Sequence, residues 1–507
     1  MSLLRRSARN FVSQTLSFAI SILDRIVLTG VFVRAWKVNG FSDWTTLWST
    51  ASLLVMIELG FQIYLGNMLV KAERRGHRRA FQLLFELGLG FYLGLSAIVL
   101  AVVAGSVALF DIGHALRLHA TGLDVVLVVL CCYQMLRIVR GGFTQVLRGR
   151  GEYHLVILTD VRATGAGIVG AIVTTLLGGG PLAVASVYLI AELLFGTIWS
   201  LSLVRRRHTD IRLRLRKPRR RQVLAAAGEL RWYSAVQVNT YLLAGLPILI
   251  AAWLGFAGAG LAGLAVQRTL VNFSRTVAAT FSAAVGVELA TIDPRRDSER
   301  LVKSVFAIAR LNVALAALAA AGITIFGETV IALWTGTPDL GSRSTLALLL
   351  LPVIIVAPVA PMTMLSIYAG APRAQGIGTG IQLILGLPLA VALGRVLGID
   401  GLVLGLAIGE IVGVGLVITM LVASKFRVPI GRLALDSLMI LFVCIFWASL
   451  VGLTLKLLIV SPSPVVAVLK LAVWSVVAGV PVLLYALPPR QRSLVLAMPA
   501  RLLYRRA

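Results

Sequence analysis

Residues 81–110 read FQLLFELGLGFYLGLSAIVLAVVAGSVALF, a stretch whose single charged residue is Glu86. A helix of about 20 apolar residues crosses a bilayer core of roughly 30 Å. Similar stretches recur along all 507 residues and are separated by short polar segments. They lack the strict alternation of a barrel strand, and lipid accepts only helices and closed barrels. The predicted fold is therefore that of an all-α, polytopic membrane protein.

Fourteen membrane-spanning helices are predicted, and the charges between them set the orientation. In chain order the spans are 11–33, 44–69, 81–110, 123–147, 155–177, 182–204, 223–254, 259–290, 303–327, 345–370, 374–396, 400–424, 435–458 and 464–486. Of the 48 Lys and Arg residues, 33 lie in segments that alternate onto one side of these spans and five lie on the other. The positive-inside rule makes the richer side cytosolic, which places both termini in the cytosol. Pro352, Pro358 and Pro361 predict a kinked or broken tenth span.

The densest basic segment divides the spans into groups. Residues 205–221 read RRRHTDIRLRLRKPRRR and follow the first six spans. We expect this segment to lie on anionic lipid headgroups rather than on nucleic acid, because it carries no aromatic platform. The predicted organisation is two six-helix lobes plus a C-terminal pair of helices. The N-lobe covers 1–204, the linker 205–222 and the C-lobe 223–424, while 425–507 holds the last two spans and a basic cytosolic tail.

Composition and motifs argue against an enzyme. A net charge of +27 together with 58% hydrophobic residues excludes a soluble nucleic-acid-binding protein. Cys131, Cys132 and Cys444 lie inside predicted spans, where we expect them to pack rather than to form disulfides or bind metal. The sequence GAGIVG at 165–170 matches a dinucleotide-binding pattern, but it lies inside a span, where small residues let helices approach closely. No catalytic residue, metal ligand or bound cofactor is predicted.

Cations inside the spans are the residues that bear on function. The ten are Arg25, Arg137, Arg140, Arg162, Arg231, Arg268, Arg275, Arg310, Lys456 and Lys470. Each costs about 2.5–3.5 kcal/mol at the centre of a membrane helix on the insertion scale. Five lie near a span end and are expected to extend to the membrane surface. They are Arg137, Arg140, Arg231 and Arg310 on the cytosolic side and Lys456 on the outer side. Arg25, Arg268 and Arg275 are not expected to reach the membrane surface in this way.

The first span carries a polar stripe. Its residues alternate in spacings of four and three, which places them on one helical face. They are Asn10, Gln14, Ser17, Ser21 and Asp24, and Arg25 adjoins the last of them. The stripe faces either a water-filled cavity or a neighbouring helix with which Asp24 and Arg25 pair. We predict the cavity, which makes Asn10, Gln14, Asp24 and Arg25 candidate binding residues.

The eighth span repeats this logic with cations. Arg268, Asn272 and Arg275 stand at i, i+4 and i+7, on one face over about 10.5 Å. Two cations without an intervening acid suit an anion of spread charge, and a guanidinium binds phosphate through its fork of donors. The alternative is packing against acids of other spans, such as Glu58 or Glu410. We predict that these three residues bind an anion.

Three short motifs resemble those of one transporter family. Leu59-Gly60-Phe61 is similar to a "dLGl" signature, Gln145–Tyr153 (QVLRGRGEY) to an "lqGlgry" loop, and Val266-Gln267-Arg268 to an "alaqr" stretch. These motifs are typical of polysaccharide-export flippases, the Wzx/PST type of the MOP superfamily, to which the lipid II flippase and MATE exporters are more distant. The likeness covers nearly the whole chain. It implies two lobes in a V-shaped arrangement, alternating access, and cavity cations on spans one and eight.

The resemblance also implies a function. It indicates a flippase of the bacterial inner membrane that moves an undecaprenyl-pyrophosphate-linked oligosaccharide to the periplasmic leaflet for surface polysaccharide assembly. A bare pyrophosphate cannot cross hydrocarbon, so a cationic cavity must replace its hydration. We expect Arg25, Arg268 and Arg275 to hold it. Asn272, Gln14 and Asn10 are expected to line the sugar path.

Further partners and alternatives remain open at this point. The polysaccharide polymerase machinery is an expected partner, and a proton or a sodium ion is the expected coupling ion. The alternatives are a MATE-like exporter of organic cations, a polytopic glycosyltransferase or ligase, and a transporter-like scaffold. Organic cations favour acidic and aromatic linings, and a glycosyltransferase needs a larger external loop than this chain offers.

Overall fold

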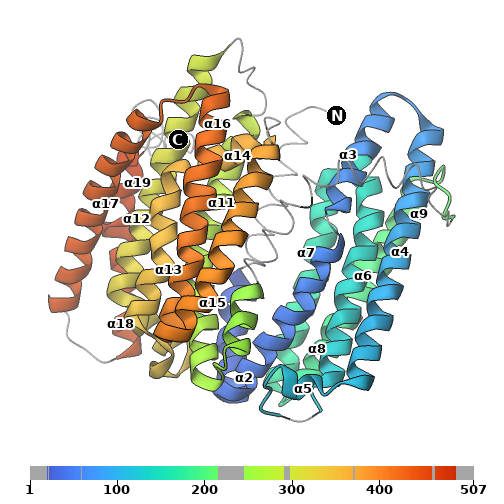
Figure 1. Cartoon of the computed structure of the whole chain (residues 1–507), viewed down its shortest axis with the longest axis horizontal. Helices are drawn as coiled ribbons and strands as arrows, with labels where there is room; N and C mark the ends of the chain where they lie inside the picture. Colours follow the sequence, from blue (N-terminus) through green and yellow to red (C-terminus); the bar gives the residue numbers. More distant parts are fainter. Residues whose placement is uncertain are drawn as a thin grey trace, which may run out of the picture. The chain divides into compact units, whose positions relative to one another are not determined.

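The computed structural model describes residues 20, 22–58, 60–120, 122–214, 234, 245–289, 297–368, 372–458 and 463–486. For 25, 279–289, 367–368, 372 and 464 it describes the backbone alone. Within these residues every regular element is a helix, and nine helices are long and apolar enough to cross a membrane (Figure 1). A bent pair, Ile26–Glu58 with Phe61–Arg74, raises this number to ten. The all-helical prediction is confirmed, and the count of fourteen spans stays a prediction.

The chain divides into two compact units between Ala265 and Val266, here called unit 1 and unit 2. The helices of unit 1 include η1 (Leu23–Leu28), α2 (Thr29–Leu53), η2 (Leu54–Glu58), α3 (Phe61–Arg74), α4 (Arg78–Leu109), α5 (Ile112–Ala115), α6 (Asp124–Gly149), α7 (Tyr153–Leu176), α8 (Pro181–Ala191), η3 (Glu192–Ile198) and α9 (Trp199–Arg207). Residues 245–253 are also helical, and α11 (Gly258–Leu289) begins in this unit. Most of 215–244, which includes part of the predicted linker, lies outside the described residues. The predicted boundaries at 204 and 222 therefore stay predictions.

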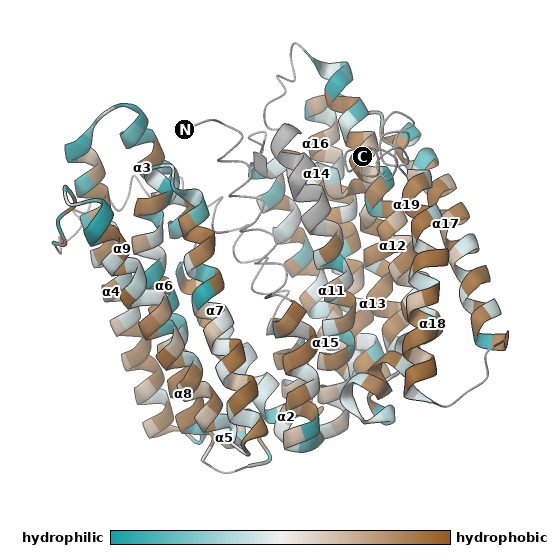
Figure 2. Cartoon of the chain, turned by 180° about the vertical axis from the view of Figure 1, so that it is seen from behind, coloured by the Kyte–Doolittle hydropathy of each residue, from teal (hydrophilic) through white to brown (hydrophobic). Residues whose placement is uncertain are grey.

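Helix α6 lies at the centre of unit 1, packed against α2, α3, α4, α7, α8 and α9. Large apolar side chains such as Leu65, Phe85, Tyr92 and Ile138 fill the core around it. Apolar side chains also cover outward faces, as expected where lipid replaces water (Figure 2). The glycine pattern at 165–170 packs α7 onto α8, because a Cβ at Gly167 would lie 2.8 Å from the Tyr188 ring. The helix-packing interpretation of this motif is confirmed.

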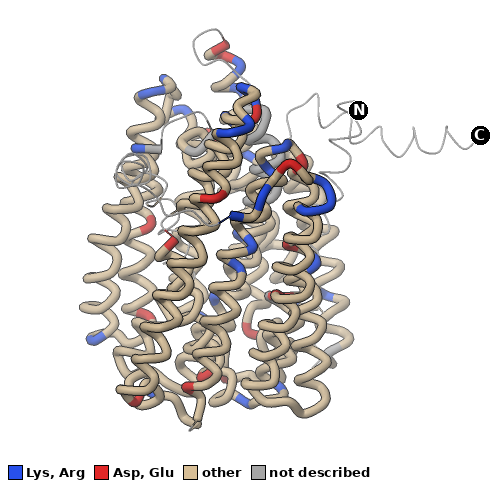
Figure 3. The backbone as a smooth tube through the Cα atoms, turned by 90° about the vertical axis from the view of Figure 1, so that its right-hand side faces the viewer, with Lys and Arg blue, Asp and Glu red and all other residues tan. Residues whose placement is uncertain are grey.

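Polar segments gather at the two ends of unit 1. Arg150 pairs with Glu73 at 2.9 Å and also with Asp210, which joins three segments predicted to be cytosolic. At the opposite end of α6, the Asp43 carboxylate accepts the backbone N–H of His119 at 3.0 Å. Both residues belong to segments predicted to be external. Charged residues lie at the helix ends and also along the helices (Figure 3).

Unit 2 is built around α12. Its helices are the end of α11 (Gly258–Leu289), α12 (Ser298–Thr335), η4 (Pro338–Leu340), α13 (Arg343–Val356), η5 (Ala357–Val359), α14 (Ala360–Tyr368), α15 (Pro372–Glu410), η6 (Ile411–Ile418), α16 (Thr419–Phe426), α17 (Ile430–Leu458), α18 (Pro464–Val477) and α19 (Gly479–Ala486). Helix α12 packs against α13, α17 and α19. The predicted break in the tenth span is confirmed, because the 3-10 turn η5 separates α13 from α14. Cys131 and Cys444 are free and buried, as predicted for packing residues.

Candidate functional site

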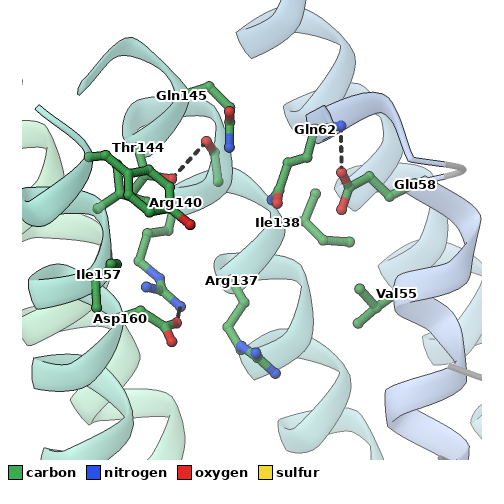
Figure 4. Close-up of a pocket in the computed structure, with 13 residues that line it drawn as sticks. Val55, Glu58, Gln62, Arg137, Ile138, Arg140, Thr144, Gln145, Ile157 and Asp160 are labelled. Carbon is green, nitrogen blue, oxygen red and sulfur yellow. Dashed lines mark hydrogen bonds and ion pairs between the residues drawn. The ribbon is translucent and has the colours of Figure 1, made fainter. Parts of the chain in front are cut away.

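A polar pocket of about 370 Å³ lies inside unit 1, between η2, α3, α6 and α7 (Figure 4). Its polar lining includes Glu58, Gln62, Arg137, Arg140, Thr144 and Asp160. Tyr153, next to the loop that joins α6 to α7, also lines it. The pocket therefore lies toward the end of unit 1 that carries the predicted cytosolic segments.

A kink in the second span delivers Glu58 to this pocket. The chain tightens into the 3-10 turn η2, and Gly60 adopts a left-handed conformation with φ of 72° before α3 begins. A side chain with a Cβ rarely adopts this conformation. Glu58 is buried, and its Oε1 accepts the backbone N–H of Gln62 at 2.7 Å. The carboxylate thus satisfies a free donor at the positive end of α3.

Arg140 joins two carboxylates across three helices. Its Nε lies 2.7 Å from Glu192 Oε1, and its Nη2 donates to Asp160 Oδ1 at 2.9 Å. Only 7% of the Arg140 side chain and 2% of the Glu192 side chain are exposed, whereas 53% of Asp160 is. The prediction that Arg140 reaches the membrane surface is wrong, because Asp160 and Glu192 neutralise it within the bundle.

The π-helix η3 makes room for this pair. Glu192 is its first residue, and a Cβ at Gly196 would lie 2.5 Å from Glu192 Oε1 and 3.1 Å from Arg140 Cδ. The wider turn and the glycine together leave the space that two charged side chains need. Single-turn π-helices of this kind often mark functional sites.

Arg137 stands one turn before Arg140 and also lines the pocket. Its Nη1 donates to Gln134 Oε1 at 3.1 Å, and its guanidinium lies 5.6 Å from the centre of the Tyr133 ring. Arg137 and Arg140 are three residues apart and therefore lie on one face of the helix, which was the signal in the sequence for this site. The site was missed because both side chains were predicted to extend to the membrane surface.

A smaller pocket of about 160 Å³ lies in unit 2. Ser274, Arg275, Asn312 and Glu410 provide its polar lining, and the broken helix at Pro352 closes one side. Arg275 Nη1 donates to Glu410 Oε1 at 2.8 Å and to Oε2 at 3.0 Å. Pairing with Glu410, the alternative left open by the sequence, is thus what the structure contains, while Arg275 also faces a pocket.

The other predicted binding residues have different outcomes. Arg268 and Asn272 are half-buried on the same helix as Arg275. Asp24 is half-buried in η1 and lies close enough to Tyr133 and Tyr188 to act on them electrostatically. Asn10, Gln14 and the Arg25 side chain lie outside the described residues. The predicted cavity shared by the first and eighth spans therefore stays a prediction.

Solved structures of membrane transporters are similar to this chain. An inward-facing multidrug resistance MATE family transporter of the MOP superfamily aligns with a TM-score of 0.66 and 15% identity, over 82% of this chain and 95% of that one. The lipid II flippase MurJ, in an inward closed conformation, aligns with a TM-score of 0.64 and 13% identity, over 94% of this chain and 98% of that one. The chain has the fold of these transporters.

The same fold occurs with a pocket of different polarity. A MOP superfamily transporter from Pyrococcus furiosus, described as having reverse polarity of its binding pocket, aligns with a TM-score of 0.59 and 15% identity, over 83% of this chain and 95% of that one. MATE transporters of this fold are known in inward-facing and outward-facing conformations. No protein-family model and no curated protein matches the sequence. The fold is therefore that of MOP superfamily transporters, and the side chains of the pockets carry the argument about substrate.

Proposed function

We propose that this protein is a flippase that moves an undecaprenyl-pyrophosphate-linked oligosaccharide from the cytosolic to the periplasmic leaflet of the bacterial inner membrane. The observation that carries the proposal is Arg275, a cation within the bundle whose guanidinium is held by Glu410 at the wall of a pocket. The fold shared with the lipid II flippase supports a lipid-linked substrate.

The Arg275–Glu410 pair is proposed to exchange its carboxylate for a phosphate. Both groups bind the same guanidinium donors, and a pyrophosphate offers more charge and more acceptor oxygens than a carboxylate. Arg268, two helical turns earlier on α11, adds positive potential and is the proposed second ligand, with Asn272 between the two cations. The Glu410 carboxylate, once released, is the proposed carrier of the coupling ion, either a proton or sodium.

The remaining features of the proposal follow from the sequence. Arg25 is proposed as a third pyrophosphate ligand, and Asn10, Gln14 and Asp24 are proposed to line the substrate path. Both termini are proposed to be cytosolic, with basic segments on anionic lipids and the polymerase machinery as the receiving partner.

Reconstitution into vesicles with a defined lipid-linked oligosaccharide tests the proposal, scored by the fraction of sugar that an external enzyme can reach. The variant R275Q is expected to lower the flipping rate by about 10- to 100-fold, since a hydrogen bond to a charged group is worth about 1.5–3 kcal/mol. The charge reversal R268E is expected to abolish flipping. Imposed proton and sodium gradients identify the coupling ion.

Arg310 provides the matched control. It forms a bidentate pair with Asp436, at 2.8 and 2.6 Å, and lines neither pocket described above. R310Q therefore removes the same charge and a comparable ion pair, and it is expected to leave flipping per folded protein nearly unchanged. Equal losses in R275Q and R310Q would contradict the assignment of Arg275. Export of an organic cation in place of lipid flipping would favour the MATE-like alternative.

A further inference from the structure

Two glutamines lie directly on the backbone of a facing helix in unit 1. A Cβ at Gly141 of α6 would lie 1.6 Å from Gln62 Nε2 of α3. A Cβ at Gly66 of α3 would lie 2.1 Å from Gln145 Oε1 of α6. In both helices the glutamine and the glycine are four residues apart, so the two contacts are reciprocal and stack one turn above the other. Only glycine leaves the space for each amide.

These amides border the polar pocket, and they add neutral donors and acceptors to it. Gln145 is 6% exposed, and its Oε1 has no hydrogen-bond partner among the described residues. Thr144 donates its hydroxyl to the Gly141 carbonyl at 3.1 Å, which leaves the hydroxyl oxygen able to accept. A buried polar atom without a partner costs free energy, so a ligand that supplies one is stabilised there.

The charges of the pocket are already balanced. Arg140 is held by Glu192 and Asp160, and Glu58 accepts a backbone N–H. The charged residues that line the pocket are two arginines, Arg137 and Arg140, and two carboxylates, Glu58 and Asp160. A polyanion such as pyrophosphate would therefore meet carboxylates without a compensating excess of cations. The pocket suits a neutral ligand that is rich in hydroxyl groups.

The size of the pocket and its apolar and aromatic lining residues also fit a neutral ligand that is rich in hydroxyl groups. A volume of about 370 Å³ falls in the range of roughly 300–1,000 Å³ typical of small-molecule sites. Val55, Ile138 and Ile157 supply apolar surface for the C–H face of a sugar ring, and Tyr153, 47% exposed, supplies an aromatic ring. We propose that this pocket binds a neutral sugar residue. The proposal rests on the proposed function for the source of the sugar, but the binding itself does not depend on it.

Protection of a cysteine in the pocket tests this proposal. Cys131, Cys132 and Cys444 are first replaced by alanine, and Ile157→Cys is introduced in the pocket wall, with Arg79→Cys on the exposed start of α4 as a reporter outside it. The purified protein is treated with a small maleimide in the presence of glucose, galactose, N-acetylglucosamine, inorganic pyrophosphate or tetraphenylphosphonium. Neutral sugars are expected to slow labelling of the pocket cysteine alone.

Two variants separate binding from folding. G141A forces the flexible end of Gln62 to move, and Q62L removes its amide, so each is expected to weaken sugar protection about fivefold, the effect of one hydrogen bond of about 1 kcal/mol. Q82L is the matched control, because Gln82 bonds Glu86 and the Arg212 carbonyl away from the pocket. It is expected to retain full protection.

Several outcomes would overturn the proposal. They are protection by no sugar, stronger protection by pyrophosphate or tetraphenylphosphonium, or equal losses in Q62L and Q82L. The proposed function can fail separately. Sugar protection without lipid flipping would contradict the flippase alone, whereas R275Q-sensitive flipping without sugar protection would contradict the sugar pocket alone.

Discussion

Arg140 shows how this protein keeps a cation inside a membrane bundle. A buried carboxylate, Glu192, holds one side of the guanidinium, and the more exposed Asp160 holds another. Removing one member of a buried pair leaves an uncompensated charge, which costs more than removing both. R140Q is therefore expected to lower the free energy of unfolding by about 3–5 kcal/mol, and R140Q/E192Q to recover most of it. Denaturant unfolding in detergent measures both.

The exposed pair of Arg207 with Glu152 supplies the comparison for this prediction. Surface pairs contribute at most about 1 kcal/mol, so R207Q is expected to cost much less than R140Q. If the double variant R140Q/E192Q unfolded as easily as R140Q, the loss would come from packing rather than from a stranded charge.

At the scale of elements, glycines decide how closely the helices of unit 2 approach. Helix α15 reverses at Gly398, where φ is 67°, and its second arm continues into η6 against the first. A Cβ at Gly413 of η6 would lie 2.5 Å from the Gly378 carbonyl oxygen and 2.6 Å from Gln382 Cβ. The contact is with backbone, which cannot move aside as a flexible side chain can.

G413A is accordingly expected to destabilise the protein by about 1–3 kcal/mol through overpacking. Gly380, on the first arm, has no atom within 4 Å of its Cβ position, so it offers a matched control. G380A is expected to be neutral or to stabilise by about 0.5–1 kcal/mol, because alanine favours the helix. In thermal unfolding, G413A is expected to lower the melting temperature, whereas G380A is expected to leave it unchanged or raise it. Equal effects of the two substitutions would show that the two arms do not meet at Gly413.

Local signals in the sequence predicted most elements, but they did not decide which charged side chains pair; Glu410 was only one of the alternative partners named for the cations of α11. The predicted spans are mostly helical within the described residues, since hydropathy and length depend on neighbours along the chain, but their bounds differ from those of the helices: α2, for example, includes residues 34–43 between the first two predicted spans. Glu192 is the first residue of the π-helix η3 and Glu410 directly precedes the π-helix η6, and each pairs with an arginine of its own unit. These pairs depend on which helices become neighbours in space, and the hydrophobic periodicity of the sequence carries no information about that.

The kink that buries Glu58 could not be predicted from the sequence either. Gly60 is part of a motif that resembles the family signature, but the motif indicates neither its left-handed conformation nor the 3-10 turn before it, which lies against α6. The sugar pocket depends on this kink and on the reciprocal contacts of Gln62 and Gln145. The shared helical face of Arg268 and Arg275 could be predicted from their spacing, whereas the pairing of Arg275 with Glu410 was the alternative to the predicted anion site.

At the scale of the molecule, the distribution of charge predicts the orientation of the chain in the membrane. Three predicted cytosolic segments meet at one end of unit 1 through Arg150, while external segments meet at the other through Asp43. Cysteines at the first end, Arg79→Cys and Arg206→Cys, are expected to react with a membrane-impermeant maleimide only in permeabilised cells. Asn39→Cys and Ala115→Cys, at the other end, are expected to react in intact cells.

Each of these four positions is exposed, so a failure to react reports the membrane barrier rather than burial. A cysteine-free parent provides the background, and labelling after permeabilisation shows that every cysteine is reactive. The reverse pattern would keep the helix arrangement and invert the orientation, which would place the pocket of unit 1 toward the periplasm. A mixed pattern within either pair would contradict the grouping of segments itself, because residues at one end of α6 cannot lie on both sides of a bilayer.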